Sequence, residues 1–157
     1  MTDVILARAI HVLGVVLWIG GLGLATLVLI PALRADAFGA MGQAVFHAIE
    51  RRFIWIARAA AVAVGLTGFH MVARLDAWDR FATLDFWWMQ AMLITWVLFM
   101  LLLFVGEPFV LHRYLEEEWR RNPRRSLAML YAVHLFMLAI SLVTVAGAVI
   151  GGHGGLF

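Results

Sequence analysis

Two histidines and two arginines lie in apolar stretches of this chain, where ionisable side chains are costly. His11 lies inside a run from residue 4 to 30 in which Arg8 is the other strongly polar residue. His70 lies near the end of a second apolar run, four residues before Arg74. Ionisable side chains within an apolar span usually face protein, water or a bound group. These four residues are therefore candidates for binding a metal ion together with an anionic group.

The two histidines are expected at similar depth if their runs form antiparallel helices. At 1.5 Å per residue, His11 lies roughly 9 Å and His70 roughly 6 Å from the same end of the helix pair. Each also has an arginine three or four residues nearer that end, on its own helix face. Neutral imidazoles bind the iron of haem b, and cations suit its propionates. The spacing predicts His11 and His70 as axial ligands, with Arg8 and Arg74 at the propionates.

Small residues next to the histidines could give a porphyrin room. Gly14 is one helical turn from His11, and Gly65, Thr67 and Gly68 precede His70. We therefore add Gly14 and Thr67 to the predicted cofactor-binding residues. Two alternatives stay open. Imidazole pairs also bind copper. Membrane histidines can also simply hydrogen-bond a neighbouring helix, while arginines extend to the interface.

A second group of possible metal ligands lies toward the other side of the apolar runs. His134, roughly 12 Å into the last run, could bind a second haem or metal with His112 or His47. Water at the helix ends could equally satisfy the last two. Met89 and Met92 are the best copper feature, since thioethers suit copper(I), although methionines at this spacing also fill apolar cores.

The composition places the chain among integral membrane proteins. Of its 157 residues, 64% are hydrophobic and 14% are charged, far from the usual composition of soluble domains. The absence of cysteine excludes disulfides and thiolate metal sites. The small excess of arginine does not form a nucleic-acid-binding patch. The apolar runs hold no Ser/His/Asp or paired-carboxylate arrangement, so we predict no hydrolytic chemistry and name no catalytic residue.

Four apolar runs predict four membrane-spanning helices, at about residues 4–30, 46–74, 86–112 and 126–150. Each is long enough to cross the hydrocarbon layer, and none alternates as a strand would. We expect the first helix to end at Pro31. The fold class predicted is all-α, a single four-helix up-and-down bundle over residues 1–157, in contact with membrane lipid.

The arginines predict the orientation and one buried ion pair. The links between the first and second and between the third and fourth runs hold eight arginines, against three on the opposite side. The positive-inside rule puts those links in the cytoplasm and both termini outside, in a bacterial-type inner membrane. Arg58 and Glu107 both fall in the cytoplasmic half of their runs. We expect them to pair as a structural bridge.

Several short motifs resemble a known family. They are IHVLGVVLWIGGL in the first run, ERRFIWIARAA and GLTGFHM in the second, WWMQAM in the third and SLVTVAGAV in the fourth. The chain resembles the small CopD-like membrane proteins, which are similar to HemJ, a membrane protoporphyrinogen oxidase that binds haem b. The resemblance implies His11 as a haem ligand, and the CopD name implies copper uptake. HemJ-like proteins carry a lysine in the third helix, where this chain has Gln90 and Ala91.

Together these observations favour a membrane b-type cytochrome, or a haem-binding subunit of a larger redox or quinone-linked assembly. The expected chemistry is one-electron transfer through one haem b, or two if His134 is also a ligand. A haem-dependent oxidoreductase is compatible with this reading, and protoporphyrinogen oxidation is less favoured because lysine is absent. The alternatives are a copper-transport protein using Met89, Met92, His70 and His11, and a structural membrane subunit without cofactor.

Overall fold

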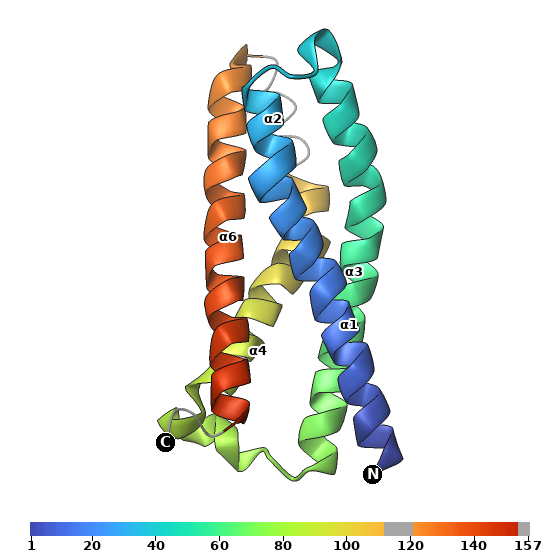
Figure 1. Cartoon of the computed structure of the whole chain (residues 1–157), viewed down its shortest axis with the longest axis vertical. Helices are drawn as coiled ribbons and strands as arrows, with labels where there is room; N and C mark the ends of the chain where they lie inside the picture. Colours follow the sequence, from blue (N-terminus) through green and yellow to red (C-terminus); the bar gives the residue numbers. More distant parts are fainter. Residues whose placement is uncertain (112–120, 154–157) are drawn as a thin grey trace.

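The computed structural model describes residues 1–111 and 121–153. In that part of the chain four helical segments are long and apolar enough to cross a membrane: Thr2–Arg34, Gly39–Arg74, Leu84–Glu107 and Pro123–Gly152. The described residues contain no strand. The helices run up and down, and the first helix begins at the same end of the bundle at which the last one ends (Figure 1). The predicted all-α, four-helix membrane fold is confirmed.

The first span is one continuous helix with a wider turn inside it. It consists of α1 (Thr2–Leu24), the π-helical turn η1 (Ala25–Leu29) and α2 (Ile30–Arg34). The prediction that this helix ends at Pro31 is wrong, since it continues to Arg34. The Ile30 N–H donates to the Ala25 carbonyl, five residues back. Pro31 then takes a first-turn position of α2, where a missing N–H costs little.

The other spans follow the predicted runs, with shifted ends. A 3₁₀ turn, η2 (Gly39–Met41), leads into α3 (Gly42–Arg74). Two further 3₁₀ turns, η3 (Asp79–Ala82) and η4 (Leu84–Phe86), precede α4 (Trp87–Leu101). The third span continues as a π-helix, η5 (Leu102–Leu111), and the fourth is α6 (Pro123–Gly152).

The first span and α3 form the most extensive helix pair of the bundle. Their contact depends on small residues. A Cβ atom added to Gly14 would lie 2.7 Å from Val64 Cγ2 and 3.3 Å from the Ala60 carbonyl oxygen, and Ala57, Ala60 and Ala61 are buried. Lipid offers no hydrophobic force between helices, so close backbone approach supplies the packing energy. The orientation of α1 about its own axis follows from this contact.

Replacing Gly14 by alanine is expected to destabilise the protein by about 1–3 kcal/mol, because the added methyl group has no room against Val64. Gly20, with nothing within 4 Å of an added Cβ, provides the matched control. Unfolding by sodium dodecyl sulfate in mixed micelles, followed by tryptophan fluorescence, measures both variants. Equal stability of Gly14→Ala and Gly20→Ala would contradict the proposed tight contact.

Tryptophans fill the space above glycines on the other helices. The Trp87 ring lies against Gly147 and the Trp88 ring against Gly151, which joins α4 to α6. Trp96 of α4 lies against Gly65 of α3, and its Nε1 donates to the Ala61 carbonyl at 2.8 Å. In the middle of the bundle, Trp18 of α1 meets the Phe99 ring edge to face at 4.6 Å between centroids. These contacts set the spacing of the four helices around the candidate site.

Candidate functional site around His11

His11 is half-buried on α1 and faces α3. Its Nδ1 lies 3.0 Å from the Val64 carbonyl oxygen and 3.3 Å from Thr67 Oγ1. The ring lies above Gly68, where an added Cβ would come within 3.3 Å of His11 Cε1. Thr67 in turn donates its hydroxyl to the Ala63 carbonyl at 2.6 Å. The imidazole is thus held by a main-chain oxygen of the neighbouring helix, and a glycine there makes room for it.

The hydrogen bond to Val64 fixes which ring nitrogen of His11 carries the proton. A carbonyl oxygen can only accept, so Nδ1 is the donor and the neutral ring keeps its lone pair on Nε2. Within residues 1–111 and 121–153, His11 Nε2 has no hydrogen bond. Metal-bound histidines commonly donate their other N–H to a carbonyl or carboxylate in this way. With Nδ1 donating to the Val64 carbonyl, the His11 imidazole is compatible with metal binding through Nε2.

His70 and Arg74 contact an acidic residue that the sequence did not single out. Asp3, in the first turn of α1, accepts from Arg74 Nε at 2.7 Å, and its Oδ2 lies 3.5 Å from His70 Nε2. His70 is 45% exposed, and Arg8 is exposed. The one sequence signal for this contact is the position of Asp3, at the end of α1 that an antiparallel hairpin brings to the end of α3. The contact joins the two helices at the end of the bundle where α1 begins.

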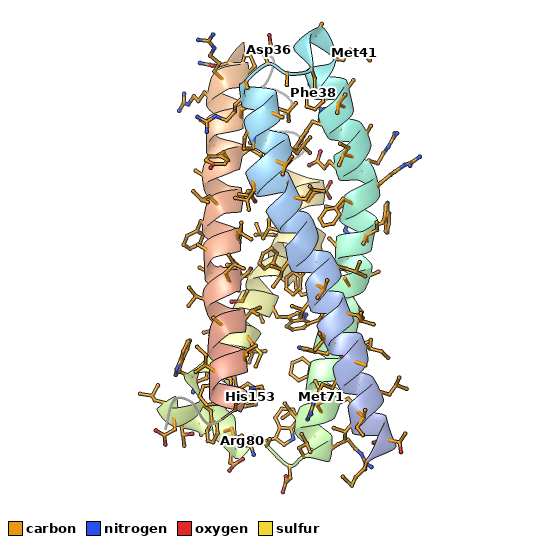
Figure 2. All side chains as sticks on the ribbon, viewed as in Figure 1. Asp36, Phe38, Met41, Met71, Arg80 and His153 are labelled. Carbon is orange, nitrogen blue, oxygen red and sulfur yellow. The ribbon has the colours of Figure 1, made fainter. Side chains whose placement is uncertain are left out.

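The two candidate haem ligands lie on the same helix pair but make contacts at different levels. The His11 ring bonds α3 at Val64 and Thr67, whereas His70 contacts Asp3, eight residues before His11 and hence roughly 12 Å away along α1. Met71, next to His70 in the chain, and His153 lie at the end of the bundle where α1 begins and α6 ends (Figure 2). Joint binding of one iron by both imidazoles stays a prediction.

The donor chemistry at His11 fits a haem ligand, but the packing between α1 and α3 leaves a porphyrin no room at the expected glycines. Gly14 is covered by Val64, Gly65 by the Trp96 ring and Gly68 by His11 itself. A macrocycle between these two helices would have to displace those groups. The roles of Gly14 and Thr67 at a cofactor stay predictions.

A comparison of the chain with protein-family models, with curated proteins and with solved structures finds no match to it. The resemblance to the CopD-like group therefore stays a prediction. Any functional proposal rests on the side chains themselves and on what they contact.

Two histidines of the second group, His134 and His47, contact residues of their own helix. His134 is half-buried on α6, and its Nδ1 lies 2.9 Å from the Leu130 carbonyl oxygen of the same helix. His47 on α3 places Nδ1 3.4 Å from Glu50 Oε2 and Nε2 3.5 Å from Gln43 Nε2. His112 lies outside the described residues. Among the described residues no three His, Cys, Asp or Glu side chains gather as a metal site, so the second haem stays a prediction.

The candidate copper residues lie at the start of α4. Met89 and Met92 are half-buried there. Between them, the Gln90 amide donates to the Phe81 carbonyl at 2.8 Å and to the Thr83 carbonyl at 3.1 Å. Gln90 thus joins the preceding loop to α4. Copper binding by the methionines stays a prediction.

The predicted pair of Arg58 and Glu107 is confirmed. Arg58 Nη2 donates to Glu107 Oε2 at 2.8 Å, and the two side chains are only 17% and 26% exposed. The guanidinium carbon also lies 5.1 Å from the Trp55 ring centroid and 5.5 Å from that of Phe104. Pairing removes most of the cost of two charges inside an apolar span.

The sequence analysis did not identify one polar atom of the core, the indole nitrogen of Trp18. Trp18, on the same face of α1 as His11 and seven residues after it, is 4% exposed. Its Nε1 is buried without a hydrogen bond among the described residues. Buried donors are nearly always satisfied, so an unpaired one merits attention near a candidate site. The spacing of seven residues from His11 is the one sequence signal that could have singled out Trp18, and nothing in the sequence shows that its N–H lacks a partner among the described residues.

Proposed function

We propose that this protein is a membrane b-type cytochrome that binds haem b through His11 and transfers single electrons, alone or as a subunit of a larger redox or quinone-linked assembly. The supporting observation is the His11 imidazole within an apolar span. Its Nδ1 is engaged by the Val64 carbonyl, and its Nε2 keeps a lone pair. When bound, haem supplies the one-electron chemistry, and the protein supplies orientation and burial.

The residues around His11 have separate tasks in this proposal. The Val64 carbonyl orients the ring and, by accepting a hydrogen bond from Nδ1–H, makes Nε2 a stronger donor to a metal. Thr67 supports the same nitrogen at 3.3 Å. Gly68 allows the ring to lie close to α3.

His70 is the proposed second ligand, with Arg74 and Arg8 at the propionates. Binding would require His70 to exchange its contact with Asp3 for the metal. Arg74 would likewise divide its interactions between Asp3 and a propionate. Replacing Asp3 by asparagine weakens both contacts and is therefore expected to favour binding rather than reduce it.

The proposed location is a bacterial-type inner membrane with both termini outside the cytoplasm. The support is the excess of arginine in the sequence between the first and second and between the third and fourth apolar runs, eight against three on the opposite side. Cysteine-accessibility labelling of single cysteines added near Asp36 and near Asp79 tests this. Labelling of the Asp36 position by an impermeant reagent in intact cells, without the Asp79 position, would overturn the orientation.

Visible spectra with metal analysis test the function. The protein purified in mild detergent is expected to give a Soret band, a sharp α band on reduction, and iron in stoichiometric amount. Stoichiometric copper without haem would favour the copper-transport alternative. If the protein is expressed with sufficient haem supply and contains neither iron nor copper, the result would favour the structural membrane subunit without cofactor.

A further inference from the structure

The side chain of Arg58 reaches a main-chain carbonyl inside the membrane-spanning region. Its Nε donates to the Leu103 carbonyl oxygen at 2.9 Å, while Nη2 donates to Glu107 Oε2 at 2.8 Å. A planar guanidinium can make both bonds at once from different nitrogens. The contact with Leu103 is not needed for the ion pair and requires its own explanation.

The Leu103 carbonyl belongs to a π-helix that contains a proline. In η5 (Leu102–Leu111) each carbonyl is expected to accept from the N–H five residues ahead. For Leu103 that residue is Pro108, which has no N–H. In an apolar surrounding without water, an unsatisfied carbonyl costs several kcal/mol. The carbonyl that the proline leaves without its backbone donor is the one that Arg58 contacts.

We propose that Arg58 supplies the hydrogen-bond donor that Pro108 lacks, so that the guanidinium completes the backbone hydrogen bonding of η5 as well as balancing the charge of Glu107. Arg58 is thus a positioning residue that fixes η5 against α3. In this proposal the proline removes a backbone donor and the arginine replaces it, although the two residues lie fifty positions apart in the sequence.

The first span offers an internal comparison. Pro31 also follows a π-helical turn, η1 (Ala25–Leu29). It stands in the first turn of α2, and in the described part of the chain no arginine side chain donates to the carbonyl five residues before it. A substitution at Pro31 therefore controls for the general effect of removing a proline from a membrane helix.

A double-mutant cycle tests the proposal. Arg58→Lys keeps the positive charge near Glu107 but cannot provide the two fixed donors. In the wild-type background it is expected to raise the unfolding equilibrium constant by about tenfold. Pro108→Ala restores a backbone N–H at the required position. In that background the effect of Arg58→Lys should fall to about threefold or less.

The measurement is unfolding by sodium dodecyl sulfate in mixed micelles, followed by circular dichroism and tryptophan fluorescence on the full chain. In the Pro31→Ala background the effect of Arg58→Lys should equal that in the wild type. An unchanged effect in the Pro108→Ala background would overturn the proposal and leave Arg58 as an ion-pair partner only. If Arg58→Lys alone cannot be purified folded, recovery of folded protein by Pro108→Ala supports the proposal, and failure to recover it overturns it.

Discussion

Replacing His11 by alanine is expected to lower the haem content of the purified protein by at least about tenfold, because the variant loses the proposed axial ligand. The alanine methyl group cannot bind iron. The substitution also removes the contacts of the ring with the Val64 carbonyl and with Thr67. Haem content is measured by the pyridine haemochrome spectrum against protein concentration. Circular dichroism and gel filtration confirm that the variant is folded.

The matched control for His11→Ala is His153→Ala. Among residues 1–111 and 121–153, His153 bonds only its own helix, through Nδ1 to the Val149 carbonyl oxygen at 2.7 Å, and it is exposed. Its removal should leave the spectrum unchanged. Full haem content in folded His11→Ala would refute the ligand assignment. Loss of haem from both variants would show that the protein does not tolerate histidine removal for reasons unrelated to a metal.

Replacing Glu107 by leucine is expected to destabilise the protein by about 3–5 kcal/mol, because it leaves the Arg58 guanidinium charged and without its counter-ion in an apolar region. Both side chains are mostly buried, so solvent screens the pair weakly. The unfolding midpoint in mixed micelles measures the effect. A loss below about 1 kcal/mol, as for exposed pairs, would contradict the assigned burial.

The double variant Arg58→Met with Glu107→Leu separates charge from hydrogen bonding. Removal of both charges should restore part of the stability lost in Glu107→Leu. Restoration should stay incomplete, because methionine cannot donate to the Leu103 carbonyl. The exposed Asp79→Asn substitution is the control for loss of an acidic residue and should have little effect.

Local properties of the sequence were enough to predict the fold. The length and hydrophobicity of four runs determine four membrane-spanning helices, since lipid allows hardly any other structure for such segments. The same argument predicted the pair of Arg58 with Glu107, because two opposite charges in one half of a membrane bundle each need a counter-ion. The error at Pro31 arose because the preceding turn widens into a π-helical turn, so that Pro31 stands in the first turn of α2 and the helix continues.

The sequence alone establishes the all-α membrane architecture and places His11 within an apolar span. It could not determine what each imidazole contacts, because the rotation of a helix about its own axis depends on side-chain packing between helices. Gly14 against Val64 and Trp96 against Gly65 set that rotation, and only the tertiary structure revealed them. The same packing directs His11 to the Val64 carbonyl and leaves His70 beside Asp3.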